Sequence, residues 1–359
     1  MAGHRSMSSL EELERWYART QMKRDLVMWA TAFVLALAQW RHIVYFFGDD
    51  LVRAVRAGRG VLEGYPHWRF FQSRLLGPWA EKILNLSFGF NFLVAHMIVS
   101  IVALTACGIV MFHAGRAIGG RQSGWSALLA FHVLFLLTMS RPWLYIWDYF
   151  LVLVGTVFLL LVIRRAPWWA FLLLMSVAFF NHESALFIGV WMVAKALIDA
   201  WAERRRPDWK LLGAGVLGSL AGQLLIEYLR TTLLIREIGW EIFSDVGKGP
   251  TSSLDAYFHV QISANLHDMY DWITHPGYEF LFLIPVPLVV VLTLAGILVA
   301  RHGLKAAGLA VYAVAQVVAL LLLGLRAETR NLLQLVPFLC LGGMLAVKPN
   351  WDTTERRVA

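Results

Sequence analysis

Charged side chains are scarce in this 359-residue chain. Asp, Glu, Lys and Arg make up 16% of the residues, whereas globular proteins usually contain about 25%. Apolar residues reach 58%. This balance excludes intrinsic disorder, because disordered chains are rich in charge and poor in apolar residues. It also excludes collagen, which needs glycine at every third position. The composition indicates a polytopic α-helical membrane protein.

Cysteine is nearly absent as well. Cys107 and Cys340 both lie inside apolar runs, which excludes a disulfide-stapled secreted fold and a Cys-x-x-Cys metal or redox site. The glycine patterns of P-loop and dinucleotide-binding proteins are missing, as are a Gly-x-Ser-x-Gly elbow and a His-Glu-x-x-His pair. The net charge of +8 does not indicate nucleic-acid binding, because the basic residues are scattered between apolar runs.

Long apolar runs dominate what is present. They predict a single transmembrane domain over 26–347, after a polar amphipathic cytoplasmic segment at 1–25 and before a cytoplasmic tail at 348–359. The first run follows Lys23 and Arg24 and is predicted to remain in place as an anchor. About ten spans are predicted, at 26–46, 88–113, 123–140, 147–163, 167–181, 184–201, 211–229, 279–300, 304–325 and 331–347.

The positions of Lys and Arg predict the orientation. Cytoplasmic loops of membrane proteins collect these residues. With both termini inside, more than half of the 32 Lys and Arg residues fall on the cytoplasmic side. The short outer loops then hold few of them. We therefore expect both termini in the cytoplasm.

Two outer segments are too long to be simple turns, at about 47–87 and 230–278. In the first, apolar and basic residues alternate up to Gly58, which predicts a helix lying in the membrane interface and then a glycine-rich turn. In the second, a helix is predicted across 253–273. No internal repeat is visible, so the sequence gives no support to an inverted-repeat transporter.

Ionisable residues near a membrane are costly, and a group of them at one depth indicates a functional site. Each has a structural alternative: Asp49 and Asp50 could cap a helix, and Arg74 and Arg330 could extend toward lipid headgroups. Their shared position at the outer ends of the spans favours one outward-facing cavity. The candidates are Asp49, Asp50, Arg69, Arg74, Arg141, Asp148, His182, Glu183, Glu328 and Arg330.

These residue types suit transfer from a sugar phosphate. A carboxylate at Asp49 or Asp50 can deprotonate an acceptor hydroxyl. Arginines hold phosphate well, because the guanidinium bonds an anion through two N–H groups. The phosphate-binding candidates are Arg69, Arg74, Arg141 and Arg330.

A metal ion is a second use of the same carboxylates. Oxygen and nitrogen ligands of this kind bind Mg²⁺ or Mn²⁺, although no diagnostic spacing is present. The sequence leaves this cofactor open. The candidate ligands are Asp49, Asp50, Asp148, His182 and Glu183.

The layout resembles the glycosyltransferase C superfamily (GT-C), the multi-span enzymes that use polyprenyl-phosphate sugars. An acidic pair follows the first span in Phe46-Phe47-Gly48-Asp49-Asp50, and a helical outer segment leads to Arg74-Leu75-Leu76-Gly77-Pro78. Trp147-Asp148-Tyr149 opens a span. Asn181-His182-Glu183-Ser184 is similar to an Asn-Arg-Glu-Thr-like turn, with His182 in place of Arg. Glu328-Thr329-Arg330-Asn331 precedes the last predicted span.

The resemblance covers roughly 26–347 and implies a GT-C-like fold. It further implies an inverting glycosyltransferase of a bacterial inner membrane, with its active site on the outer side. The donor would be a polyprenyl-phosphate-linked sugar, and the acceptor a lipid-linked glycan or another membrane lipid. Asp148, His182, Glu183 and Glu328 would support the site.

Three other functions remain open at this stage. A polymerase or ligase of lipid-linked glycans also uses outward Arg and acidic residues. A transporter or flippase of lipid-linked or anionic solutes would need charges at the bilayer midplane, where few are present. A structural or assembly subunit would tolerate loss of the outer acids.

Overall fold

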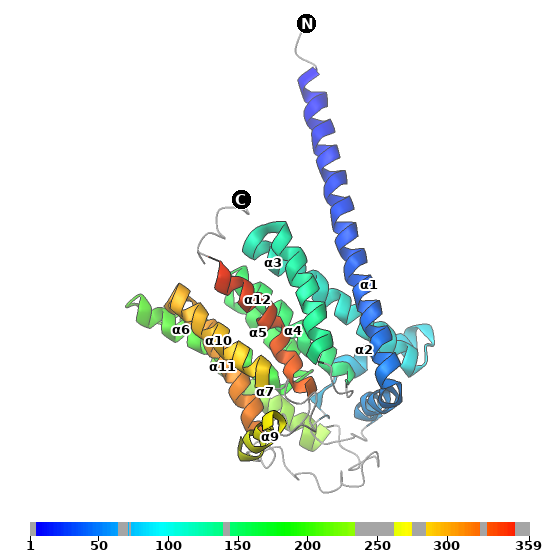
Figure 1. Ribbon diagram of the computed structural model, residues 1–359, viewed down its shortest axis with the longest axis vertical. Helices are drawn as coiled ribbons and strands as arrows, with labels where there is room; N and C mark the ends of the chain where they lie inside the picture. Colours follow the sequence, from blue (N-terminus) through cyan, green and yellow to red (C-terminus); the bar gives the residue numbers. More distant parts are fainter. Residues whose placement is uncertain are drawn as a thin grey trace.

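The described part of the protein, in a computed structural model, comprises residues 5–63, 71, 73–138, 144–233, 262–274, 285–323 and 329–348, and it contains no β-strand. Eight of its helices are long and apolar enough to cross a membrane. The expected all-α, multi-pass membrane class is confirmed at this level. Figure 1 shows the helices side by side in a bundle, with the first half of α1 projecting beyond it.

The described elements follow one another along the chain in a fixed order. The first four are α1 (Arg5–Glu63), α2 (Leu76–Phe88), α3 (Phe92–Thr138) and α4 (Ile146–Ile163). They are followed by α5 (Trp168–Phe179), η2 (Glu183–Ala185), α6 (Leu186–Ala202), α7 (Trp209–Tyr228) and η3 (Leu229–Leu233). The last five are α9 (Ile262–Thr274), α10 (Pro285–His302), α11 (Leu304–Leu323), η6 (Thr329–Leu335) and α12 (Val336–Val347).

Helix α3 is a hairpin of two arms. Its helical geometry breaks at Gly119 and Gly120, and the positive φ of Gly120 (83°) is a conformation that glycine adopts without steric cost. The arms pack closely: a Cβ atom at Gly115 would lie 2.5 Å from the Ser123 carbonyl oxygen. The two arms correspond to the spans predicted at 88–113 and 123–140. Counting both arms and the short α5, the described residues supply ten apolar segments.

Helix α1 departs from the expectation. It bends at Phe47, whose φ and ψ are not helical, and then continues to Glu63. The helix therefore continues through Gly58, where the sequence predicted a turn. Gly58 instead packs against a neighbouring helix, since a Cβ atom at this position would lie 3.2 Å from Glu81 Oε2. Helices were predicted within the first long segment, and the structure has two of them there: the part of α1 after the bend, and α2. Of the helix predicted at 253–273, the described part is α9.

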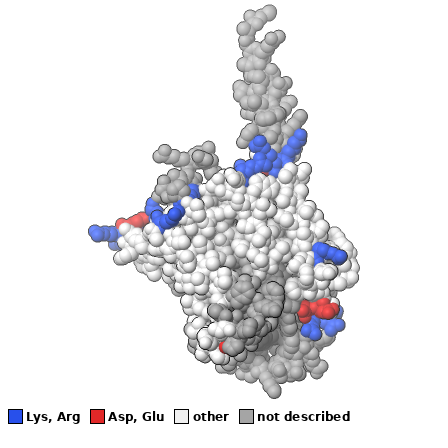
Figure 2. Space-filling model, in the orientation of Figure 1, with Lys and Arg blue, Asp and Glu red and all other residues white. Residues whose placement is uncertain are grey.

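The two ends of the bundle differ in charge. One end, here called the Arg164 end, holds the α4–α5 and α6–α7 connections and the turn at Gly303. The other, the Ile146 end, holds the starts of α4 and η6 and the ends of α5 and α7. Figure 2 shows a broad surface between them with few charged side chains, and blue Lys and Arg gathered at its margins. The first half of α1 and the last residues of α12 lie at the same end (Figure 1).

Candidate functional site

A charged cluster lies buried at the Ile146 end. Glu183 on η2 is its centre: its Oε1 accepts a hydrogen bond from Arg74 Nη2 and its Oε2 accepts one from Arg230 Nη2, both at 3.1 Å. Arg330 Nη1 lies 3.6 Å from Asp148 Oδ2. Arg74, Asp148 and Arg230 are all at least nine-tenths buried. These five residues, the charged cluster from here on, come from five separate segments of the chain.

Aromatic rings lie against two arginines of the charged cluster. The Arg74 guanidinium lies 4.8 Å from the ring centre of Phe71 and 5.5 Å from that of Trp147. The Arg330 guanidinium lies 4.6 Å from the Tyr145 ring. Such contacts favour a cation that has lost part of its water shell. The rings therefore help to hold positive charge in a buried position.

Backbone hydrogen bonds join the segments that carry the cluster. The Leu75 and Leu76 N–H groups both donate to the Phe180 carbonyl, at 2.6 and 2.9 Å. Asn181 Nδ2 donates to the Trp147 carbonyl at 2.9 Å. Residues distant in sequence are thus fixed to one another by the main chain, and the charged side chains depend only partly on their own pairing for position.

Asp148 has a second, local role. Its Oδ2 accepts a hydrogen bond from the Tyr145 backbone N–H at 2.9 Å, which forms half of a capping box at the start of α4. Asp148 is also one of the candidate site residues predicted from the sequence. It caps α4 and also faces Arg330, so the two roles coexist.

His182 is neutral at neutral pH. Its Nδ1 accepts a hydrogen bond from the Ser184 N–H at 3.1 Å, which requires an unprotonated nitrogen. Burial lowers the pKa of His182 to about 3; Glu183 raises it, while Arg74, Arg230 and Arg330 lower it further. Burial also lowers the pKa of Arg74, and Glu183 opposes that shift. Arginine nevertheless keeps its charge in proteins.

The predicted aspartate pair lies on α1, which carries none of the residues of the charged cluster. Asp49 and Asp50 follow the bend of α1, and Asp49 is exposed. Asp50 Oδ1 lies 3.5 Å from Arg53 Nη1, one turn along the same helix. Within the described residues, neither carboxylate bonds to a member of the charged cluster. Three further candidates, Arg69, Arg141 and Glu328, lie outside the described residues.

Arg230 is the member that sequence analysis missed. It directly follows the span predicted at 211–229, and it was therefore assigned to the second outer segment as a loop residue. Its side chain is 1% exposed and pairs with Glu183. The signal was present, because Arg230 lies at the same end of a span as the other candidates.

A second buried ionisable pair also escaped prediction. Glu81 Oε1 on α2 lies 2.6 Å from His96 Nδ1 on α3, and both side chains are fully buried. Burial raises the pKa of Glu81, and the hydrogen bond with His96 counteracts the shift. The pair links α2 to α3 next to the start of α4, because Gly58 contacts both Glu81 and Ile146.

The contacts among the described side chains add no support to the predicted metal site. Across the described ranges, no three His, Cys, Asp or Glu side chains come close enough to share an ion. Mg²⁺ or Mn²⁺ at Asp49, Asp50, Asp148, His182 or Glu183 stays a prediction.

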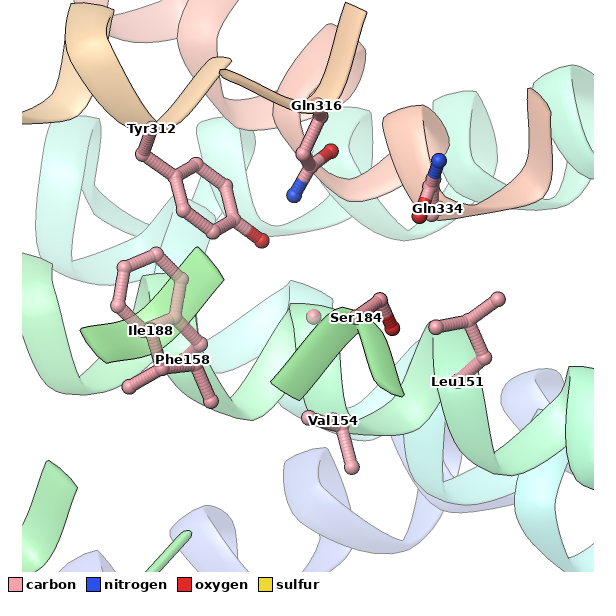
Figure 3. A pocket seen from close by; sticks show the side chains of 9 residues that line it. Leu151, Val154, Phe158, Ser184, Ile188, Tyr312, Gln316 and Gln334 are labelled. Atoms are coloured by element: carbon pink, nitrogen blue, oxygen red, sulfur yellow. The ribbon is translucent and has the colours of Figure 1, made fainter. Parts of the chain in front are cut away.

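A small cavity of about 20 Å³ adjoins the charged cluster. Figure 3 shows Tyr312 and Gln316 on α11 facing Ser184 and Phe158 across it, with Gln334 beside them. We call this cavity the Tyr312 pocket. Its lining residues are Leu151, Val154, Gly155, Phe158, Ser184, Ile188, Tyr312, Gln316 and Gln334.

Comparisons of this chain with protein-family models, with curated proteins and with solved structures gave no match. The functional argument therefore depends on the site itself.

The low pKa of His182 predicts an acid-sensitive fold. Between about pH 6.5 and 3 the unfolded chain binds a proton at His182 that the folded protein does not, so folding stability falls as the pH drops through this window. We expect acidification from pH 7 to pH 5 to cost wild type about 1–2 kcal/mol more than His182→Asn. Asn retains an acceptor for the Ser184 N–H. Unfolding midpoints in detergent at both pH values measure this; equal losses in the two proteins would contradict it.

Proposed function

We propose that this protein is an integral-membrane glycosyltransferase. It transfers a sugar from a polyprenyl-phosphate donor to a membrane lipid or a lipid-linked glycan. The observation that carries the proposal is the charged cluster itself: three guanidinium groups lie at one end of the bundle, and aromatic rings lie against two of them. Guanidinium groups bind phosphate through paired N–H groups. A lipid phosphate at the membrane surface is an anion of this kind.

The chemistry needs a base and a stabilised leaving group. In the proposed reaction, Asp49 or Asp50 takes the proton of the acceptor hydroxyl, and the hydroxyl oxygen bonds to the anomeric carbon. The bond between that carbon and the phosphate oxygen breaks, and the phosphate leaves with the electron pair. Arg330 and Arg74 stabilise the negative charge that develops on it. Attack opposite the phosphate inverts the anomeric centre.

The proposal requires the base and the cluster to meet through the substrates. Asp49 is exposed and pairs with no described side chain, so it is available to an acceptor. The cluster, in contrast, is buried against aromatic rings. An exposed carboxylate and a buried cationic site suit a reaction in which a water-facing acceptor meets a membrane-held donor.

We further propose that the Ile146 end faces the outside of a bacterial inner membrane, with both termini in the cytoplasm. The support is the accumulation of basic residues at the opposite end, as the positive-inside rule requires. That end carries Arg164, Arg165, Arg204, Arg205, Arg206, Arg301 and Lys305.

Cysteine labelling tests this orientation. Ser87 near the end of α2 and Gln122 beside the α3 turn are both exposed, and they lie at opposite ends of the first α3 arm. Native Cys107 and Cys340 are buried, so they give little background. We expect an impermeant maleimide to label Ser87→Cys in intact cells and Gln122→Cys only after permeabilisation. The reverse pattern would place the site in the cytoplasm.

Arg330 provides the test of donor binding. Its side chain is 10% exposed, the most of the three arginines in the cluster, so it is the arginine most accessible to an incoming phosphate. We expect Arg330→Gln to weaken binding of polyprenyl phosphate to the protein in nanodiscs about tenfold or more. Arg164→Gln, at the opposite end, is the matched control and keeps wild-type affinity. Equal affinities in all three proteins would refute the phosphate site.

A further inference from the structure

The Tyr312 pocket continues from the charged cluster into the membrane domain. Ser184 is the residue after Glu183, Leu151 lies three positions after Asp148, and Gln334 lies four after Arg330. Three of the pocket's lining residues therefore come from the same elements as the cluster, within four residues of a cluster member along the chain. A ligand bound at the cluster would lie next to the mouth of this pocket.

The pocket is polar but uncharged. Its lining combines the Tyr312 and Ser184 hydroxyls with the side-chain amides of Gln316 and Gln334, and it includes no Asp, Glu, Lys, Arg or His. Gln316 is 3% exposed, and its Oε1 has no hydrogen-bond partner in the described structure. Polar side chains inside a membrane domain are costly and usually functional. This buried acceptor is available to a donor that enters the pocket.

The geometry specifies the kind of group that fits. Figure 3 shows the Tyr312 hydroxyl and the Gln316 amide facing the same space, with the Phe158 ring as an apolar wall. A hydroxyl both donates and accepts hydrogen bonds, and can satisfy Gln316 Oε1. A hydrocarbon group would leave that oxygen unpaired, and an anion would find no cation among the lining residues. A volume of about 20 Å³ accommodates a group the size of one water or hydroxyl.

We infer that the Tyr312 pocket binds a hydroxyl of the sugar on the lipid-phosphate donor. This inference rests on the proposed function, because the phosphate at the charged cluster sets the position of the sugar. The pocket would then allow the protein to distinguish a glycosylated lipid phosphate from the bare one.

Binding measurements with two classes of lipid test the inference. The probes are polyprenyl phosphate and polyprenyl phosphates carrying glucose, galactose or mannose, added to the full-length protein in nanodiscs. We expect wild type to prefer at least one glycosylated lipid. Gln316→Met removes the amide with little change in volume, and is expected to reduce that preference about tenfold without changing affinity for the bare lipid. Tyr312→Phe is the second variant if Gln316→Met does not fold.

Gln39→Met is the matched control. Gln39 is also a buried glutamine in a span, but its Nε2 donates to the His132 carbonyl on α3, away from the pocket. It should keep the preference. A wild type that binds the bare lipid but prefers no glycosylated form, or pocket variants that retain the preference, would overturn the pocket assignment alone. A wild type that binds none of the four lipids would overturn the proposed function together with this inference.

Discussion

Glu183→Ala is expected to destabilise the protein by about 3–5 kcal/mol and to abolish activity. The variant leaves Arg74 and Arg230 without their shared carboxylate, and both are almost completely buried. Removing one partner from a buried ion pair costs this much, because the remaining charge stays without compensation. Here two charges lose the same partner. Unfolding in detergent, followed by a tryptophan signal or by aggregation, measures the loss.

Glu203→Ala is the control for this experiment. Glu203 pairs with Arg205 in the α6–α7 connection, where both side chains are at least half exposed. Exposed pairs contribute about 0–1 kcal/mol, so we expect little change. Similar losses in Glu183→Ala and Glu203→Ala would show that the charged cluster does not stabilise the fold.

The largest effect on turnover is expected at the aspartate pair. Loss of a general base usually costs about 100- to 10,000-fold in rate, and Asp49→Asn or Asp50→Asn should do so without changing the unfolding midpoint. The reason is exposure: Asp49 has no described partner, and Asp50 faces only Arg53 across one turn. Transfer of radiolabelled sugar in membranes, compared with thermal unfolding of the same variants, separates activity from stability.

Asp199→Asn serves as the comparison, because Asp199 lies near the end of α6, at the Arg164 end of the bundle. Asp199 pairs with Lys195 four residues earlier, and we expect the variant to retain its activity. If both Asp49→Asn and Asp50→Asn turn over at the wild-type rate, neither aspartate is the base. The catalytic part of the proposal would then fail, although the anion-binding role of the cluster would still stand.

Apolar length predicted most of the fold. The division of α3 into two arms, the short α5 and the final helix all follow from where apolar runs begin and end. The turn expected after Gly58 is wrong for a packing reason. Glycine is a poor helix former in isolation, but at this position it allows α1 to approach Glu81 closely. The local preference of glycine for turns is visible in the sequence, whereas the contact between Gly58 and Glu81 is not.

The candidate site was predicted in part. Arg74, Asp148, Glu183 and Arg330 meet because each lies at the same end of a span, which the topology alone indicates. Which of them pair was not predictable, since pairing depends on how the helices are arranged around one another. The Tyr312 pocket was missed for another reason. Its polar residues are uncharged and occur singly within apolar runs, where hydropathy conceals them.

The pairing in the charged cluster has a consequence for biogenesis. Arg74 pairs with Glu183, which lies 109 residues further along the chain. Asp148 pairs with Arg330, which is synthesised near the end of the chain. Neither ion pair can form before its later residue has been synthesised. A chain that is truncated or stalled before η6 would therefore lack the contact between Asp148 and Arg330. The charged cluster is thus assembled late in the synthesis of the chain.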